Sequence, residues 1–185
     1  MGVKVDHLTK HADEIGDRIA VIDDRVGHPV REFDYVSFNG RVNALANGFL
    51  ALGASEGSHI AWWGNNSVEV LTTIHAIRKA GGVSIPIPYR STSEEALYLL
   101  GVADVEILVI ESRYVPVVEK ISDQLPKLDH IITFGGVEAD YVGKPMGEIL
   151  GSSDTPVSEG NFIGTQNMIF TSGTTGKPKG AVRKV

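Results

Sequence analysis

The sequence predicts an α/β protein whose mostly parallel β-sheet carries helices on both faces. Short β-rich runs alternate with longer segments of helical periodicity along most of the 185 residues. Four runs are too continuously apolar for half-exposed strands: His59–Trp63, Val83–Pro88, Glu106–Glu111 and His130–Gly135. Strands buried on both faces and separated by helices are typical of a parallel sheet, because each helix carries the chain back across one face.

The first fifty residues predict a helix, a hairpin and a second helix. His7–Gly16 has the pattern of a short amphipathic helix. Ala20–Asp23 and Arg31–Asp34 flank the turn-rich stretch DRVGHP and are expected to pair as a hairpin. From Ser37 to Leu52 apolar residues recur at intervals of three and four, which predicts an amphipathic helix that Gly53 ends. The polar residues of this segment are expected on its other faces: Asn39, Arg41, Asn43 and Asn47.

A third helix is predicted between Ser67 and Gly81. Ser67 is a suitable N-cap, and Gly81 follows the last turn. Arg78 and Lys79 in that last turn are expected to be solvated, with anion binding as the alternative. His75 lies in the middle of the helix beside apolar residues, so we interpret it as a core or interface histidine rather than a catalytic one.

The rest of the chain predicts three further helices and one more strand. A helix over Ser93–Ala103 is expected to use Ser93 as its cap, with two acidic residues in the first turn that favour the positive end of the helix dipole. Val115–Leu125 and Tyr141–Leu150 are also predicted to be helical. Gln166–Thr171 is predicted to be a strand.

A change in composition separates two parts of the chain. Gly151–Asn161 is rich in Gly, Ser, Asp and Pro and reads as a linker or surface loop. We therefore expect an N-terminal α/β subdomain at 1–150, a loop at 151–165, and at 166–185 a strand with its following loop that starts the next part of a larger domain. Gly180–Val185 is expected to begin a strand whose neighbours lie in later residues.

Composition excludes several classes of function. The formal net charge is −6, which argues against a nucleic-acid binder. The sequence contains no cysteine, so disulfides, thiolate metal sites and a cysteine nucleophile are excluded. The N-terminus lacks a secretory pattern, and no apolar run approaches the ~18 residues of a spanning helix, so we expect a cytoplasmic protein without a transmembrane segment.

The aromatic and histidine residues form no catalytic constellation in the sequence. Trp62 and Trp63 are neighbours on a predicted strand, so they are expected to point to opposite faces and to pack in the core. The remaining histidines have no metal-site spacing.

The segment Thr171–Gly180, TSGTTGKPKG, carries the chemistry of the sequence. It follows an apolar strand and contains three glycines, four hydroxyl residues and two lysines. Glycines let backbone N–H groups approach an anion, hydroxyls donate to phosphate oxygens or bind Mg²⁺, and lysine adds a compact positive charge. These properties predict a loop that holds a polyphosphate rather than a plain connector.

This loop differs from the Walker loop, G-x-x-x-x-G-K-[ST]. Thr171 stands five residues before Gly176, where the Walker pattern requires glycine. Pro178 follows Lys177, where the Walker pattern has Ser or Thr at the start of a helix. A Walker-type NTPase is therefore excluded by the loop.

The stretch FTSGTTGKPKGAV resembles the phosphate-loop signature of the adenylate-forming, or AMP-binding, superfamily, which includes acyl-CoA synthetases, nonribosomal adenylation domains and luciferases. The upstream segments around WWGNN, KAGG and STSEEALYLL are similar to the first helix–strand units of that superfamily. The similarity starts near His7 and covers nearly the whole chain, which resembles about the first third of such an enzyme. It implies the N-terminal subdomain of the adenylate-forming fold.

The resemblance implies a phosphate-binding role for specific residues. By analogy with the signature, the following contact the β- and γ-phosphates of ATP: Thr171, Ser172, Gly173, Thr174, Thr175, Gly176 and Lys179. Thr174 is the hydroxyl assigned near Mg²⁺, and Lys177 is left as an auxiliary or solvated charge. The adenine-binding segment, the magnesium-binding glutamate and the catalytic lysine of the superfamily lie after the loop, so no catalytic residue is assigned within residues 1–185.

The resemblance also implies the reaction. A carboxylic acid, with a fatty acid preferred, attacks ATP to give an acyl-adenylate, and coenzyme A then takes the acyl group. The fragment alone is expected to be inactive. Two alternatives stay open: an amino-acid or aryl-acid adenylation enzyme, and a non-catalytic α/β module that binds phosphate or a partner. A homo-oligomer also stays open, because surface that later strands would cover can self-associate.

Overall fold

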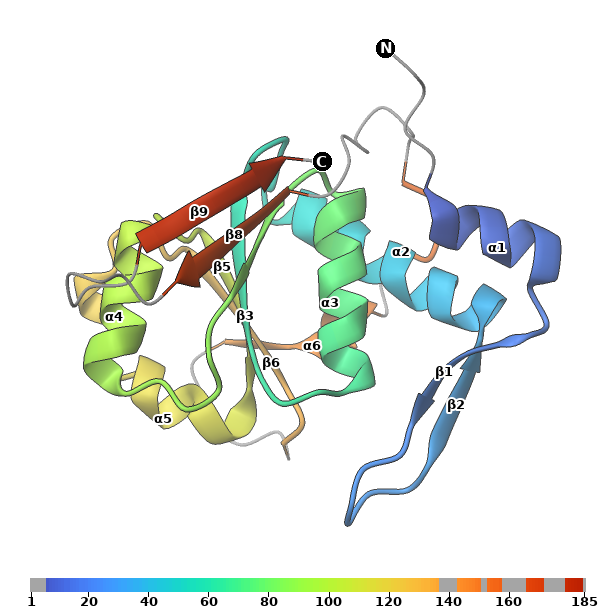
Figure 1. The fold of residues 1–185 in the computed structure, drawn as a ribbon, viewed down its shortest axis with the longest axis horizontal. Helices are drawn as coiled ribbons and strands as arrows, with labels where there is room; N and C mark the ends of the chain where they lie inside the picture. The colour runs from blue at the N-terminus through green and yellow to red at the C-terminus, as the bar shows by residue number, and fades with distance from the viewer. Residues whose placement is uncertain (1–5, 137–142, 151–152, 158–165, 172–178, 185) are drawn as a thin grey trace.

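A computed structural model describes residues 6–136, 143–150, 153–157, 166–171 and 179–184. Its centre is a seven-stranded sheet in the order β7-β6-β5-β3-β4-β8-β9 (Figure 1). The strands are β3 His59–Trp63, β4 Val83–Pro86, β5 Ile107–Glu111, β6 His130–Phe134, β7 Lys144–Pro145, β8 Gln166–Thr171 and β9 Lys179–Lys184.

The sheet is parallel from β7 to β8 and antiparallel only where β8 meets β9, among the strands described. The predicted fold class, a mostly parallel sheet in an α/β protein, is therefore confirmed. The expectation that Gly180–Val185 finds its neighbours only in later residues is wrong. Strand β9 pairs with β8 along its length, with Gln166 opposite Lys184 and Thr171 opposite Lys179.

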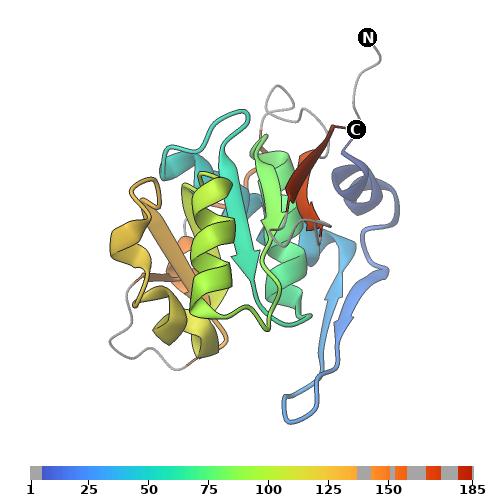
Figure 2. The same ribbon diagram turned by 60° about the vertical axis from the view of Figure 1, so that its left-hand side comes forward.

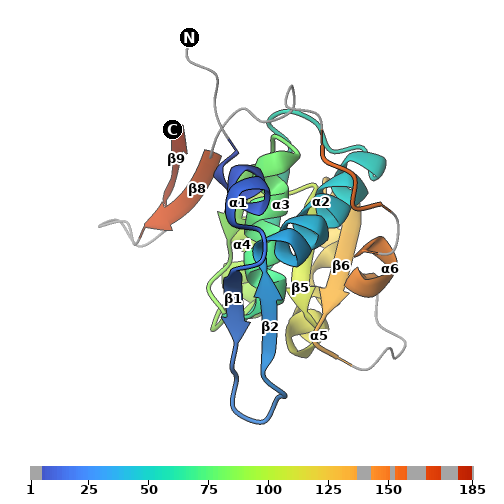
Figure 3. The same ribbon diagram turned by 90° about the vertical axis from the view of Figure 1, so that its right-hand side faces the viewer.

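Helices cover both faces of the sheet. Figure 3 shows α1, α2, α3 and α6 on one side, and Figure 2 shows α4 in front of the opposite face. The helices are α1 His7–Ile15, α2 Tyr35–Ala51, α3 Val68–Lys79, α4 Ser93–Val102, α5 Val115–Val118 and α6 Met146–Leu150. Successive residues of β5 point to opposite faces of the sheet. Ile107 and Val109 pack in the core under α2, whereas Leu108 and Ile110 pack in the core under α4.

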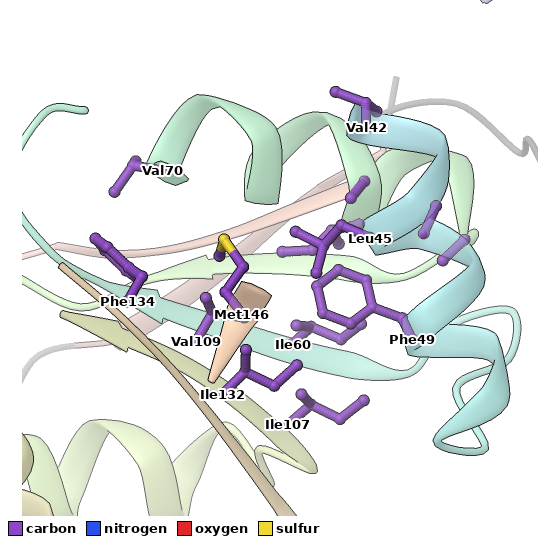
Figure 4. Packing of buried hydrophobic residues seen from close by; sticks show 14 of the residues in the cluster. Val42, Leu45, Phe49, Ile60, Val70, Ile107, Val109, Ile132, Phe134 and Met146 are labelled. Carbon is purple, nitrogen blue, oxygen red and sulfur yellow. The ribbon is translucent and has the colours of Figure 1, made fainter. Parts of the chain in front are cut away.

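The larger core packs α2 against the sheet. Phe49 and Leu45 of α2 lie against Ile60 of β3 without measurable exposure (Figure 4). Helix α6 closes the end of this core through Met146. Gly48 allows the close approach of the two helices, because a Cβ at this position would collide with the Ile149 side chain. Burial of these apolar side chains is the main source of stability for this layer.

A two-stranded hairpin stands beside the sheet. Strands β1 Ile19–Asp23 and β2 Arg31–Asp34 pair antiparallel, which confirms the predicted hairpin, and they project away from the main body in Figures 1 and 3. Strand β2 leads directly into α2, whose N-cap is Asp34. The Asp34 side chain accepts a hydrogen bond from the Ser37 amide at 2.7 Å, so the helix begins two residues before the predicted start.

Three predicted helices differ from the structure in detail. Helix α4 is capped by Thr92 rather than Ser93, through a reciprocal capping box with Glu95. The predicted helix Val115–Leu125 is wrong beyond Val118, where the α-helix ends and the chain continues to the 3₁₀ turn η2 Ser122–Gln124. Another 3₁₀ turn, η1 Ser112–Tyr114, directly precedes α5. The buried residues Val115, Val118, Ile121 and Leu125 are three, three and four positions apart, and intervals of three suit a 3₁₀ turn as well as an α-helix.

The predicted helix Tyr141–Leu150 is also shorter than expected. Residues 141 and 142 lie outside the described part of the chain, and Lys144–Pro145 forms strand β7 beside β6. A proline disfavours helical geometry in the residue before it, so Lys144 is extended and α6 begins only at Met146. The predicted subdomain boundary at residue 150 stays a prediction. Strand β8, which follows that boundary, pairs with β4, which precedes it, in one sheet.

Candidate functional site

The carboxyl ends of the parallel strands meet at one edge of the sheet, where α/β proteins bind their ligands. Strands β3, β4, β5 and β8 all end at this edge because they run in the same direction. Strand β8 ends at Thr171, directly opposite Lys179 at the start of β9. The predicted phosphate loop therefore connects two paired strands at the edge that suits a phosphate site.

The structure locates only two of the predicted site residues. Thr171 and Lys179 are placed as backbone partners across β8 and β9. The other predicted site residues lie outside the described part of the chain: Ser172, Gly173, Thr174, Thr175 and Gly176. Their contacts with phosphate or Mg²⁺ stay predictions.

A hollow of about 540 Å³ opens at the same edge of the sheet. It lies between the turn after β3, the segments after β4 and β5, and the tip of the hairpin. Its lining residues are Arg25, Val26, His28, Gly64, Asn65, Asn66, Tyr89, Glu111 and Arg113. Three basic side chains, one tyrosine ring and several amide groups suit a ligand that carries both phosphate and an aromatic ring.

Glu111 occupies the floor of this hollow at the end of β5. The residue is 3% exposed, although it carries a carboxylate. Its Oε2 accepts a hydrogen bond from the Asn65 amide at 2.9 Å, and its Oε1 lies 2.5 Å from Nε of Arg113. Buried carboxylates need partners of this kind, because leaving the charge unpaired in the interior is costly.

An aromatic pair lies behind the hollow. Trp63 of β3 is fully buried and stacks on Tyr114, with ring centroids 5.3 Å apart. The Tyr114 hydroxyl donates to Oδ1 of Asn65 at 3.3 Å, and burial together with the charge of Glu111 raises the pKa of Tyr114. Trp62 points to the other face and donates from Nε1 to Oγ of Ser84 at 3.1 Å. The predicted placement of the two tryptophans is confirmed.

A cluster of charges attaches the hairpin to α3. Asp23 at the end of β1 pairs with Arg31 and, at 2.9 Å, with Nε of Arg25. Glu69 of α3 accepts from Arg31 Nη1 at 2.8 Å and lies within 3.7 Å of Arg41 Nη2. Burial raises the pKa of Glu69, but the hydrogen bond from Arg31 and the arginine charges outweigh burial and leave that pKa below its ordinary value. This cluster positions the hairpin tip, and with it Arg25, at the hollow.

Lys79 is buried, so the expectation that it is solvated at the end of α3 is wrong. The residue is 5% exposed. Its Nζ donates to Oδ1 of Asn39 and Oδ1 of Asn43 at 2.6 Å each, and to Oγ1 of Thr9 at 2.9 Å. The Asp6 carboxylate, which also caps α1, lies 2.9 Å from the same ammonium. One cation thus joins α1, α2 and α3.

The two asparagines correct the predicted pattern of α2. Asn39 and Asn43 were expected on an outer face, but they are 9% and 2% exposed and face Lys79. Asn47 also has a structural role, since its Nδ2 donates to the Thr155 carbonyl at 2.9 Å. Helix α2 is therefore buried on more than one side, and its polar residues are satisfied within the protein.

His75 is partly buried beside Phe38 of α2, which agrees with the prediction of a core or interface histidine. Its ring meets the Phe38 ring edge-on, with centroids 5.8 Å apart. Burial, and then the charge of Arg78, lower the pKa of His75 from 6.5 to about 4, and Lys79 acts in the same direction while Asp6 opposes it. The imidazole of this partly buried residue is therefore neutral at pH 7.

We expect acid to destabilise the protein through His75 between pH 6.5 and 4. The unfolded chain binds a proton near pH 6.5, whereas the folded protein resists protonation of His75 until about pH 4. Lowering the pH from 6.5 to 5 should thus reduce the free energy of unfolding by about 2 kcal/mol. Urea unfolding at several pH values measures this, and His75→Gln should flatten the slope in that range. His28→Gln in the exposed hairpin loop is the control, and an equal flattening there would contradict the assignment.

Sequence reasoning missed most of the residues around the hollow. Asn65, Tyr89, Glu111 and Arg113 have no motif of their own, but Glu111 ends a predicted strand of the parallel sheet and the other three closely follow one. Their position at the carboxyl ends of strands is the signal that would have found them. Within the described residues, no group of three or more His, Cys, Asp or Glu side chains is arranged to hold a metal ion. None of the helices in the described ranges has the length and apolarity needed to span a membrane.

The fold defines an α/β protein with a mostly parallel sheet, whose candidate site lies at the carboxyl edge of that sheet. The family described as AMP-binding enzyme matches residues 8–185, so the chain belongs to that family. Crotonobetaine/carnitine–CoA ligase of Salmonella agona (strain SL483) is 30% identical over 172 residues, which are 90% of this chain and 33% of the relative. The corresponding ligase of Salmonella heidelberg (strain SL476) is 31% identical over the same length.

Solved structures have the same fold. Anthranilate CoA ligase AuaEII, in complex with anthranoyl-AMP, has a TM-score of 0.86 at 21% identity, with 98% of this chain and 35% of that chain covered. A long-chain-fatty-acid–CoA ligase (FadD1) from Archaeoglobus fulgidus has a TM-score of 0.81 at 20% identity, with 95% and 35% covered. These matches show that the chain has the fold of about a third of each of these CoA ligases. The chain spans about a third of the length of the relatives that it matches.

Proposed function

We propose that this chain supplies the phosphate-binding part of an ATP-dependent carboxylic acid–CoA ligase. The observation that carries this proposal is the segment TSGTTGKPKG, which begins at the last residue of β8 and ends within β9, in a chain of the AMP-binding enzyme family. The CoA ligases among its relatives support the choice of coenzyme A as the acceptor.

The reaction has two steps. A carboxylate oxygen attacks the α-phosphorus of ATP, the bond to the bridging oxygen of the β-phosphate breaks, and pyrophosphate leaves. The thiolate of coenzyme A then attacks the acyl carbon of the adenylate, and AMP leaves with the bonding electrons. Because negative charge moves onto the pyrophosphate oxygens, donors held near the β- and γ-phosphates stabilise the first step.

The proposed loop matches that demand. Backbone N–H groups of Gly173 and Gly176, the hydroxyls of Ser172 and Thr175, and the Lys179 ammonium would contact the β- and γ-phosphates. Mg²⁺ prefers oxygen ligands and commonly binds through phosphates and few protein groups, so the Thr174 hydroxyl fits the metal that accompanies ATP. When bound, Mg²⁺ neutralises charge on the phosphate oxygens.

The hollow at the carboxyl edge of the sheet is the proposed site for coenzyme A. Arg25 and Arg113 offer guanidinium groups to phosphate, His28 adds a further nitrogen donor, and Tyr89 offers a ring for stacking on adenine. Tyr89 is 47% exposed, and the Arg90 guanidinium lies 5.1 Å from its ring centroid. A polyanionic ligand with one aromatic base suits these groups.

We propose a fatty acid as the acid substrate, and keep aryl and amino acids as the alternatives. A non-catalytic phosphate-binding module is the remaining alternative. We also propose that residues 1–185 alone do not turn over, because they span about a third of the relatives. The discriminating assay measures acid-dependent pyrophosphate release by the full-length ligase with a fatty acid, carnitine, anthranilate and an amino acid, and the fatty acid should give the fastest release. Faster release with any of the other three would contradict the proposed substrate, and release above background by the 185-residue chain would contradict its proposed inactivity.

A binding experiment tests the loop directly. We expect a phosphorus NMR titration of ATP with the 185-residue chain to shift the β and γ resonances more than the α resonance, with a Kd of about 1 mM or weaker. Lys179→Ala should weaken binding by about tenfold, because one charge-assisted hydrogen bond is lost. Lys144→Ala, on the exposed strand β7, is the control. Equal effects of the two substitutions, or a shift confined to the α resonance, would overturn the loop assignment.

A further inference from the structure

Glu111 joins two walls of the hollow, and the proposed reaction does not use it. Its carboxylate is buried where β5 opens onto the hollow, and its two oxygens serve different segments. One oxygen holds the Asn65 amide in the turn after β3, and the other holds Nε of Arg113 in the segment after β5. A single side chain thus sets the distance between these two segments.

The segment after β5 is fixed at several points around Glu111. Ser112 Oγ donates to the Phe134 carbonyl at 2.8 Å, which ties the segment to the end of β6. The Tyr114 hydroxyl holds the side chain of Asn65, while Glu111 holds the backbone amide of the same residue. The Asn65 turn after β3 is therefore held at two points: Glu111 of β5 binds its backbone, and Tyr114 of the following segment binds its side chain.

Arg113 is the exposed member of this arrangement. Its side chain is 56% exposed, whereas the Glu111 side chain is 4% exposed. The ion pair engages Nε, and the guanidinium lines the hollow. An exposed arginine loses rotamer entropy when it binds an anion, and a buried partner that already orients it reduces that cost.

We propose that Glu111 is a positioning residue for the coenzyme site. It orients the Arg113 guanidinium towards a phosphate group and holds the Asn65 turn as the opposite wall. This inference rests on the proposed function, which places coenzyme A in the hollow. Glu111 has a counterpart at the other end of β5, since Glu106 accepts hydrogen bonds from Ser58 Oγ at 2.9 Å and from the His59 amide at 3.3 Å.

The test is a double-mutant cycle with coenzyme A as the probe. Glu111→Gln keeps a carbonyl oxygen that can accept from the Asn65 amide. It removes the negative charge that pairs with Arg113 and leaves a neutral amide group there. We expect calorimetry to show about tenfold weaker binding for Glu111→Gln and for Arg113→Gln. The double variant should bind no more weakly than either single variant, because Glu111 acts through Arg113. Glu106→Gln, at the amino end of the same strand, should leave the affinity unchanged.

A second readout separates positioning from loss of folding. The Asn65 amide should exchange with solvent faster in Glu111→Ala than in wild type, and at the wild-type rate in Arg113→Gln, with circular dichroism checking the fold of each variant. Additive losses in the cycle, or an equal loss for Glu106→Gln, would overturn the positioning role. A wild-type chain that does not bind coenzyme A would overturn the role together with the coenzyme site. The ATP titration would still report on the phosphate loop, so the two failures are distinguishable.

Discussion

Lys79→Met is expected to lower the free energy of unfolding by about 3 kcal/mol. Methionine replaces the aliphatic stem of lysine with similar volume but removes the ammonium. The Asp6 carboxylate and the amide oxygens of Asn39 and Asn43 then lose their shared donor. Removing one member of a buried ion pair leaves the other charge without compensation, which is costlier than losing an exposed pair. Urea denaturation at pH 7 measures the loss.

Two companion variants make the Lys79 prediction specific. Lys10→Met removes a lysine that is 52% exposed and 3.8 Å from Glu14 on α1, so it should cost less than about 0.5 kcal/mol. Adding Asp6→Asn to Lys79→Met should recover part of the loss, because it removes the uncompensated carboxylate and keeps an N-cap residue. A loss below about 1 kcal/mol for Lys79→Met would show that the ammonium is not needed to hold α1, α2 and α3 together.

Phe49→Ala is expected to lower the free energy of unfolding by about 4 kcal/mol. Phe49 lies between α2 and the sheet with no exposure, beside Leu45 and Ile60 in Figure 4. Truncation to alanine loses the transfer free energy of the ring and leaves a cavity that the surrounding strands cannot fill. At this chain length the loss corresponds to a fall in Tm of about 10 °C, which differential scanning calorimetry measures.

The matched variant for Phe49 is Val102→Ala. Val102 ends helix α4 and is 57% exposed, so its truncation should change the free energy of unfolding by no more than about 0.5 kcal/mol. A similar Tm for the two variants would mean that the core under α2 repacks around the missing ring.

Much of the fold follows from patterns that are local in the sequence. The strands at His59–Trp63 and His130–Phe134 have the apolar continuity that burial on both faces demands. Ser67 caps α3 as its residue type predicts, with its side chain accepting from the Val70 amide at 3.2 Å. The failures are local as well: the apolar spacing after Val115 is compatible with both helical geometries, and tertiary packing selected the 3₁₀ turns.

The candidate site also has one part that the local sequence predicts and one part that depends on the tertiary structure. The segment from Thr171 to Gly180 predicts a phosphate loop because its residue types and their order are contiguous in the chain. The hollow is not contiguous, since Arg25, Tyr89 and Arg113 come from three separate segments. No periodicity or motif in the sequence indicates that these segments lie at the same edge of the sheet. That becomes clear only when the strand order is known.

The sequence by itself determined the α/β class, most of the strands and helices, and the segment that we predict to bind phosphate. Each depends on neighbouring residues, through apolar periodicity, capping or loop composition. Only the tertiary structure decided the partners of the isolated charges. Lys79 meets Asn39 and Asn43 across 40 and 36 positions, and Glu111 meets Asn65 across 46. A buried charge requires partners, but only the packing of the helices and strands determines which distant residues lie within hydrogen-bonding distance.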